Sequence, residues 1–144
     1  MDIIFAGSFD PFTKGHDDIV RRVLAFADKV IVAIGIHPEK HGSVGAEERK
    51  NKIENIYKDN DNVEVEIYEG LTTDYAKRKG IDVLVRGVRN AVDFEYEKNM
   101  AEVNRRLTGI ETILLIADPE YASISSSVVR ELASFGKDVS EFLP

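Results

Sequence analysis

The segment IIFAGSFDPFTKGHDDIV, residues 3–20, decides the fold. Its first four residues, Ile3–Ala6, form a continuously apolar run of the kind found in strands buried on both faces. Gly7–His16 follows as a loop, and Asp17 and Asp18 open a helix, where two carboxylates suit the helix dipole. The apolar residues of this helix recur at helical spacing: Ile19, Val20, Val23, Leu24 and Ala27. The segment therefore predicts a buried strand, a loop and an amphipathic helix.

The same alternation of strand and helix continues along the chain. We expect four further strands, at Val30–Ile36, Val63–Ile67, Val83–Val85 and Thr112–Ala117. We expect four further helices, at Glu47–Lys58, Leu71–Lys79, Asp93–Leu107 and Ser127–Phe135. Such alternation predicts a parallel sheet with helices on both faces, and right-handed crossovers from a central first strand give the order 3-2-1-4-5. Because no repeat or linker divides it, we expect residues 1–144 to form one Rossmann-like, doubly wound α/β domain.

Composition limits the classes of function. The chain is 43% hydrophobic and 31% charged, which is typical of a globular protein. Its formal net charge is −7, whereas a general nucleic-acid binder needs a basic face. No apolar run approaches the roughly 18 residues that span a bilayer, and the start lacks the features of a signal peptide. The chain has no cysteine, which excludes disulfides and thiolate metal sites. We therefore expect a cytoplasmic protein that binds neither nucleic acid nor membrane.

The loop at Gly7–His16 has the chemistry of a phosphate-binding site. Its two glycines, Gly7 and Gly15, let backbone amides approach a ligand, and the helix that follows adds partial positive charge. Ser8, Thr13 and His16 supply side-chain donors. The other interpretation is an ordinary strand-to-helix turn in which His16 is a cap. The TxGH spacing after SFDP is more particular than a glycine pair alone, and it differs from a Walker P-loop.

A second candidate is Arg86-Gly87-Val88-Arg89, at the end of the predicted fourth strand. Ligands of doubly wound sheets bind at the carboxyl ends of the strands, where the strand order reverses, so this segment should face the first loop. Two arginines there suit phosphate oxygens. The alternative is that they pair with acids such as Asp93 and Glu97. Glu97 itself lies on an acidic helix, where a solvated face is the simpler interpretation.

Two weaker candidates complete the set. Three hydroxyls at Ser125–Ser127 precede a helix and could bind an anion, although a simple N-cap needs only one serine and is the simpler interpretation. Lys40 follows the second strand and could be an ordinary solvated loop lysine. His37 and His41 flank it, but no carboxylate or further histidine with metal-binding spacing accompanies them.

At these residues the sequence resembles the phosphopantetheine adenylyltransferase family of the TxGH nucleotidyltransferase superfamily, and the resemblance covers essentially the whole chain. It is carried by GSFDPFTKGH at Gly7–His16, VRGVRNAVDFEYE at Val85–Glu97, Asn104-Arg105 and ISSSVVRE at Ile124–Glu131. TxGH with ISSS is typical of the superfamily, and the RGxR…DFEYE block of the family. The resemblance implies transfer of the adenylyl group of ATP to 4′-phosphopantetheine in coenzyme A biosynthesis, with Mg²⁺ and in a homohexamer, a dimer of trimers.

The resemblance also implies roles for individual residues. His16 would stabilise the transition state, and Lys40 and Arg86 would act with it. Contacts with phosphopantetheine would come from Ser8, Lys40, Thr72 and Arg86. Contacts with ATP would come from Ser8, Phe9, His16, Gly87, Val88, Arg89, Glu97, Tyr121, Ala122, Ser123, Ile124, Ser125, Ser126 and Ser127. No protein side chain is implied as a Mg²⁺ ligand, since the phosphates of ATP would carry the ion. Ser8 and Tyr121 stand where the family usually has Thr and Trp.

The chemistry of this reaction suits the residues present. A phosphate monoester has its second pKa at about 6, so the acceptor is already an anion and needs no general base. The site must align the two substrates and stabilise charge, which predicts direct in-line attack without a covalent intermediate. Two alternatives remain open: a related nucleotidyltransferase acting on nicotinamide mononucleotide or glycerol phosphate, and a non-catalytic nucleotide sensor.

Overall fold

The structure of the chain is a computed structural model, which describes residues 1–36 and 43–144. Its strands are β1 (Asp2–Gly7), β2 (Lys29–Ile36), β3 (Val63–Glu69), β4 (Val83–Val88) and β5 (Glu111–Ile116). Its helices are α1 (Lys14–Leu24), α2 (Ser43–Ile56), α3 (Thr72–Lys79), α4 (Ala91–Thr108) and α5 (Ser126–Ser134), and a 3₁₀ turn covers Ser140–Phe142. Each predicted strand and helix is present.

The five strands form one parallel sheet with the order β3-β2-β1-β4-β5, which confirms the predicted topology. The two central strands pair only briefly. β1 pairs with β2 along all six of its residues, but with β4 only at Ile4–Leu84 and Phe5–Val85. The strand order reverses at this pair, and the two strands part toward their carboxyl ends. A crevice therefore opens where a doubly wound sheet binds its ligands.

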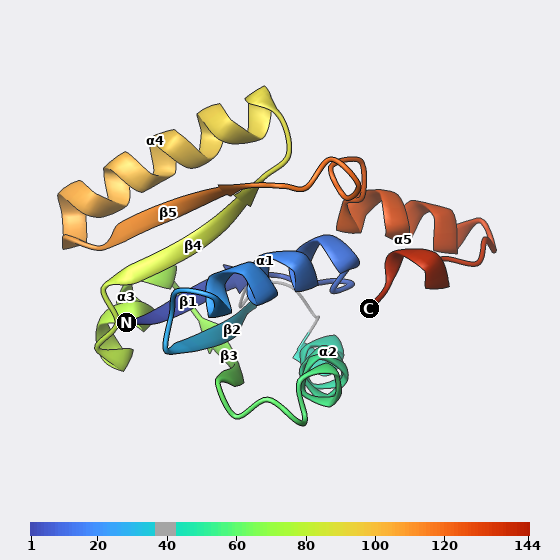
Figure 1. The fold of residues 1–144 in the computed structure, drawn as a ribbon, viewed down its shortest axis with the longest axis horizontal. Coiled ribbons are helices and arrows are strands. Elements are labelled where there is room, and N and C mark those ends of the chain that lie inside the picture. Colours follow the sequence, from blue (N-terminus) through green and yellow to red (C-terminus); the bar gives the residue numbers. More distant parts are fainter. Residues whose placement is uncertain (37–42) are drawn as a thin grey trace.

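Side chains alternate between the two faces of the sheet, and each face has its own helices (Figure 1). Ile3 and Phe5 of β1 belong to the core cluster that also contains Ile53 of α2 and the apolar stripe of α1. Ile4 and Ala6 belong to the opposite cluster, with Tyr68 and with Tyr75 and Ala76 of α3. α4 lies along β4 and β5. The result is a layer of helices on each side of the sheet.

α5 lies outside these layers, beyond the carboxyl end of β5 and next to the start of α1 (Figure 1). Two side chains attach it to the β1–α1 loop. Ser126 Oγ donates a hydrogen bond of 2.8 Å to the carbonyl of Pro11, and Arg130 donates to the carbonyl of Asp10. The C-terminal part of the chain is thereby joined to the loop that the sequence singles out.

Several element boundaries differ from the prediction by a few residues, and two of the differences bear on the site. β4 runs to Val88 rather than Val85, because Arg86, Gly87 and Val88 pair with Leu114, Leu115 and Ile116 of β5. Arg86 and Gly87 therefore lie on a strand and not in the loop that follows it. α1 begins at Lys14 rather than Asp17, because the side chain of Thr13 caps the helix there.

Candidate active site

A cavity of about 410 Å³ lies where β1 and β4 separate. Its walls come from the β1–α1 loop, the end of β4, the first turns of α4 and the segment before α5. The ATP contacts expected from the sequence that line it are Ser8, Phe9, His16, Gly87, Arg89, Glu97, Tyr121, Ile124, Ser125, Ser126 and Ser127, and Arg86 lines it as well. Val88, Ala122 and Ser123 do not line it. The structure thus brings together segments up to 120 residues apart in sequence.

A reciprocal cap fixes the orientation of His16. The backbone N–H of Thr13 donates to Nδ1 of His16 at 2.9 Å, while the backbone N–H of His16 donates to Oγ1 of Thr13 at 3.4 Å. This is a capping box in which histidine replaces the usual Glu or Gln. Because Nδ1 accepts a hydrogen bond, the proton of the neutral ring lies on Nε2. The N–H available to a ligand is therefore at Nε2.

Aromatic packing keeps the imidazole neutral. The ring of His16 lies 5.0 Å from that of Phe9, 5.3 Å from Phe12 and 6.1 Å from Phe5, measured between ring centres. Burial, together with the smaller effect of the charges of Arg86 and Arg89, lowers the pKa of His16 to about 4. At neutral pH the side chain is an uncharged hydrogen-bond donor.

Phe9 belongs to the core as well as to the wall of the cavity. It is only 2% exposed, and its ring packs edge-on against Phe5 and Phe12. Its backbone φ of 49° lies in the left-handed region, which is uncommon for a residue other than glycine. Gly7 makes room for this arrangement, since a Cβ there would lie 3.1 Å from Cζ of Phe9. Gly7 thus accommodates a core ring, and the contact of Phe9 with ATP stays a prediction.

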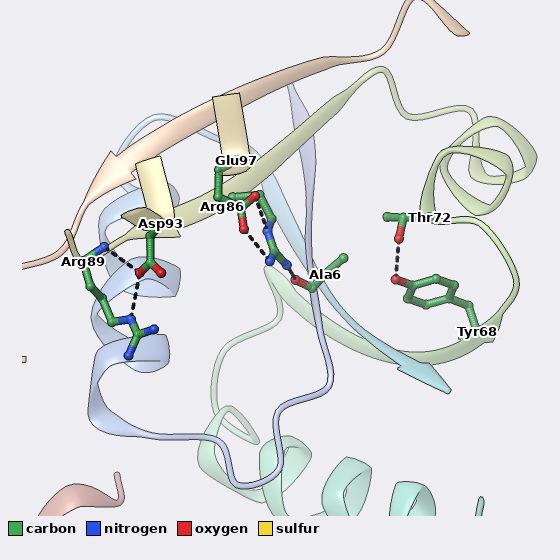
Figure 2. Close-up of polar contacts among 7 residues, drawn as sticks. All are labelled: Ala6, Tyr68, Thr72, Arg86, Arg89, Asp93 and Glu97. Atoms are coloured by element: carbon green, nitrogen blue, oxygen red, sulfur yellow. Dashed lines mark hydrogen bonds and ion pairs between the residues drawn. The ribbon is translucent and has the colours of Figure 1, made fainter. Parts of the chain in front are cut away.

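Arg86 and Glu97 form a two-pronged ion pair at the centre of the site (Figure 2). Nε and Nη2 of Arg86 donate to the two carboxylate oxygens of Glu97 at 3.0 and 2.7 Å. Nη1 donates at 2.6 Å to the carbonyl of Ala6, just beyond the last paired residues of β1 and β4. Burial by itself lowers the pKa of Arg86, but the hydrogen bonds and charge of Glu97 outweigh this effect and raise it. The expectation that Glu97 faces solvent was wrong, because it is 8% exposed.

Arg89 forms the second ion pair of the site. Its Nε donates to Oδ2 of Asp93 at 3.0 Å, and its backbone N–H donates to the same atom at 3.2 Å. Both arginines are thus paired with the acids named as alternatives in the sequence analysis. Their side chains nevertheless remain 37% (Arg86) and 36% (Arg89) exposed, on the walls of the cavity. Each can therefore contact an anion while its acid partner holds it in place.

The three serines at the start of α5 make different contacts. Ser125 is the N-cap of α5, where its Oγ accepts from the backbone N–H of Val128 at 3.1 Å. Ser126 joins α5 to Pro11, and Ser127 accepts a weaker hydrogen bond from Arg130. The capping interpretation therefore holds for one serine. All three also line the cavity, beside the first backbone N–H groups of the helix.

A second cavity of about 190 Å³ adjoins the first. The two share Ala6, Arg86, Tyr96 and Glu97, so the ion pair lies between them. Thr72, expected to contact the acceptor, lines this second cavity, with Met100, Ala101 and Asn104 of α4. Lys40 lies outside the described residues.

Sequence reasoning missed Tyr96 and assigned no individual role to Asn104. Tyr96 lines both cavities and Asn104 lines the smaller one. Spacing gives a signal for Asn104, because Asp93, Glu97, Ala101 and Asn104 follow one another at intervals of four, four and three residues. Such residues share one face of a helix. That face of α4 lines the two cavities.

Comparison with known proteins gives the family. The cytidylyltransferase-like family matches residues 4–132. A phosphopantetheine adenylyltransferase of Porphyromonas gingivalis is 52% identical over 98% of this chain and 92% of its own. Those of Phocaeicola vulgatus and Bacteroides fragilis are 50% and 47% identical, again over 98% of this chain and over 93% and 94% of their own. The chain belongs to the phosphopantetheine adenylyltransferase family. Membership confirms the resemblance read from the sequence and makes the chain a nucleotidyltransferase.

Solved structures agree on the fold of this adenylyltransferase family. The crystal structure of a bifunctional NMN adenylyltransferase/ADP ribose pyrophosphatase from Francisella tularensis matches 99% of this chain with a TM-score of 0.75. Sequence identity is 18%, and the match spans 44% of that longer protein. The similarity concerns the nucleotidyltransferase fold alone.

In residues 1–36 and 43–144, no helix is both long and apolar enough to cross a membrane. Over the same ranges, no three His, Cys, Asp or Glu side chains are grouped so that they could hold a metal ion.

Proposed function

We propose that the protein transfers the adenylyl group of ATP to 4′-phosphopantetheine, forming 3′-dephospho-coenzyme A and pyrophosphate for coenzyme A biosynthesis. Relatives that share about half of its residues over nearly its full length carry the name of this enzyme. The observation that carries the proposal is the pair of adjoining cavities that share Arg86 and Glu97. A transfer between two phosphate-bearing substrates needs two sites that meet at a cationic group.

ATP would occupy the larger cavity. The N-terminal ends of α1 and α5 both meet its walls, and backbone N–H groups at a helix start favour phosphate oxygens. Arg89 adds a positive charge and His16 an uncharged N–H donor. Ser127 and Ser8 add hydroxyls. The resulting set is rich in donors, which suits a polyphosphate.

The acceptor would occupy the smaller cavity, with its phosphate toward Arg86. Thr72 and Arg86 lie on the walls of this cavity, and Ser8 lies on the wall of the larger one. Apolar atoms of Leu84, Met100 and Ala101 would contact the rest of the acceptor. The part expected of Lys40 stays a prediction.

The proposed mechanism is direct in-line attack by the acceptor phosphate on the α-phosphorus of ATP. No side chain has to remove a proton, because a phosphate monoester is anionic at neutral pH. Arg86, held by Glu97, would align the acceptor, and Nε2–H of His16 would stabilise charge on the reacting phosphoryl group. The ring carries a single proton there, because Nδ1 accepts the backbone N–H of Thr13.

Mg²⁺ remains part of the proposal. The donors on the cavity walls are mainly cationic or hydroxyl groups, which fit phosphate oxygens better than they fit a metal ion. We therefore expect the ion to arrive bound to the phosphates of ATP, whose charge it would partly neutralise.

The assembly and the compartment are also proposed. α4 exposes several apolar side chains: Val92, Phe94, Val103 and Leu107. Val92, Val103 and Leu107 share one side of the helix, and exposed apolar side chains of this kind are typical of a surface that another subunit covers. They support an assembly through α4; the homohexamer, a dimer of trimers, and the cytoplasm are proposed from the family resemblance.

The proposal is tested by offering the purified protein ATP and Mg²⁺ with phosphopantetheine, nicotinamide mononucleotide or glycerol 3-phosphate, and reading products by mass spectrometry. We expect an adenylylated product only from phosphopantetheine. His16→Ala should retain the fold and acceptor binding but lose about 100-fold or more in turnover, as loss of a transition-state donor does. Product from another acceptor instead, or ATP binding with no product from any acceptor, would contradict the proposal and favour the related transferase or the sensor.

A further inference from the structure

Thr72, the first residue of α3, has a partner that no motif of the sequence indicates. The hydroxyl oxygens of Thr72 and Tyr68 lie 2.7 Å apart, within one hydrogen bond (Figure 2). Tyr68 is near the end of β3 and does not line either cavity, whereas Thr72 lines the smaller one. The hydrogen bond to Thr72 therefore links Tyr68 to the wall of the acceptor cavity.

The ring of Tyr68 is held from two sides. It stacks on Tyr75 of α3 with ring centres 4.7 Å apart and an angle of 18° between the planes. On β2, Gly35 is its register partner, and a Cβ at Gly35 would lie 2.9 Å from the Tyr68 hydroxyl and 3.1 Å from Cζ. No side chain other than hydrogen fits there without moving the ring. The position of the Tyr68 hydroxyl is thus determined by packing.

The partner of the stack is anchored in turn. The hydroxyl of Tyr75 donates to Glu66, and the other oxygen of this carboxylate accepts from Nζ of Lys79 at 2.8 Å. Tyr75 therefore has no O–H left to donate to Thr72. Of the two stacked tyrosines, Tyr68 is the one whose hydroxyl forms a hydrogen bond with a residue of the cavity wall.

We propose that Tyr68 is a positioning residue that orients the hydroxyl of Thr72 toward the phosphopantetheine acceptor. A phenol is a stronger donor than an aliphatic alcohol, so Tyr68 donates and Thr72 keeps its own hydrogen for an oxygen of the acceptor. A hydroxyl that accepts one hydrogen bond becomes a stronger donor in the next. The bond from Tyr68 would therefore strengthen the one from Thr72 to the acceptor. The inference rests on the proposed function, because it concerns the same acceptor site.

A purely structural role would look different. Tyr68 and Thr72 flank the turn at Gly70, whose φ is +83°, and their hydrogen bond also spans that turn. If holding the turn were its only effect, removing the Tyr68 hydroxyl would lower stability and change both substrates alike. If it orients Thr72, only the acceptor is affected.

The test uses the full chain, with dissociation constants from calorimetry and steady-state kinetics for both substrates. Tyr68→Phe should weaken phosphopantetheine binding about five- to tenfold, the effect of one lost hydrogen bond. The KM for ATP should stay within about twofold of wild type. Tyr75→Phe is the matched control, since it removes the other hydroxyl of the same stack, and it should leave acceptor binding unchanged. Thr72→Val should abolish the effect of Tyr68→Phe when the two are combined.

The outcomes separate the two proposals. If wild type converts phosphopantetheine but Tyr68→Phe binds it normally, the positioning role is overturned and the proposed function stands. The same holds if Tyr68→Phe weakens binding equally in the Thr72→Val background, or weakens ATP as much as the acceptor. If wild type neither binds nor converts phosphopantetheine, both proposals are overturned.

Discussion

At the scale of single residues, His16 has only one ring nitrogen free for a ligand, because the other is committed to the backbone of Thr13. The cap of α1 therefore does two things at once: it begins the helix and it selects the tautomer of the histidine. Aromatic burial then keeps the ring uncharged. Helix capping and the protonation state of a candidate catalytic group depend on the same hydrogen bond.

The lowered pKa of His16 predicts how stability depends on pH. The pKa falls from 6.5 in the unfolded chain to about 4 in the folded one, so below pH 6.5 the unfolded state takes up a proton that the folded state refuses. Stability is therefore lost as the pH falls from 6.5 to 4, by up to about 3 kcal/mol. Urea unfolding at pH 7 and pH 4.5 measures this loss.

His16→Gln is the matched control for this measurement, because glutamine can accept the same capping hydrogen bond and does not titrate. Its loss of stability between the two pH values should be smaller than that of wild type by about 2 kcal/mol. Equal losses in the two proteins would show that the pKa of His16 is not lowered.

At the scale of secondary structure, the pairing of β2 with β3 limits the size of the side chain at position 35. The ring of Tyr68 crosses its register partner on β2 so closely that an added methyl group overlaps it. Glycine in a strand interior usually weakens the strand, but here it admits the phenol that bonds Thr72. Gly35 thus lowers the strand propensity of β2 but allows the hydrogen bond between Tyr68 and Thr72 at the cavity wall.

Two substitutions of glycine by alanine are predicted to have opposite signs. Gly35→Ala should destabilise the protein by about 1–3 kcal/mol, because the core at Tyr68 is already full. Gly45→Ala should stabilise it by about 0.5–1 kcal/mol, since Gly45 lies in α2 with only Arg49 near its Cβ position, at 3.9 Å. Chemical denaturation measures both. Destabilisation of similar size in both would contradict the packing described around Tyr68.

The sequence allows the elements and their order to be predicted, because apolar runs and helical spacing are local signals. It does not reveal where a strand stops when a neighbour determines its end. β4 continues through Arg86 because β5 pairs with it, and β5 lies far along the chain. The same limit applies to Glu97, whose burial follows from its pairing with Arg86 on another element. A cap by His16 was one of the two interpretations of the loop, but the sequence did not show that the helix begins as early as Lys14, since histidine is an unusual partner in a capping box.

At the scale of the whole molecule, the described surface carries large apolar side chains on the outside of α4. Val92 is 79% and Leu107 is 77% exposed, at opposite ends of this helix. α4 also carries Glu97 and Asn104 on the face toward the cavities. An assembly through α4 would therefore bring subunit contacts within one helix diameter of the site.

Leu107→Glu is predicted to weaken the proposed assembly, since burying a carboxylate against a neighbouring subunit is unfavourable. We expect wild type to have the mass of a hexamer by light scattering, and the variant to dissociate at a concentration at least tenfold higher. Phe26→Glu, an exposed aromatic residue just after α1, is the control and should leave the mass unchanged. A monomeric wild type, or a Leu107→Glu protein with unchanged mass, would contradict the assembly through α4.

The brief pairing of β1 with β4 has a consequence for inhibition. Where the strands part, the guanidinium of Arg86 satisfies the Ala6 carbonyl and the carboxylate of Glu97. Replacing Arg86 would leave a nearly buried carboxylate without its partner, at a cost of about 3 kcal/mol, in a protein class whose total stability is about 5–15 kcal/mol. A compound anchored on Arg86 would thus bind a residue whose replacement destabilises the protein, whereas replacing Arg89, whose partner Asp93 is more exposed than Glu97, would have a smaller effect.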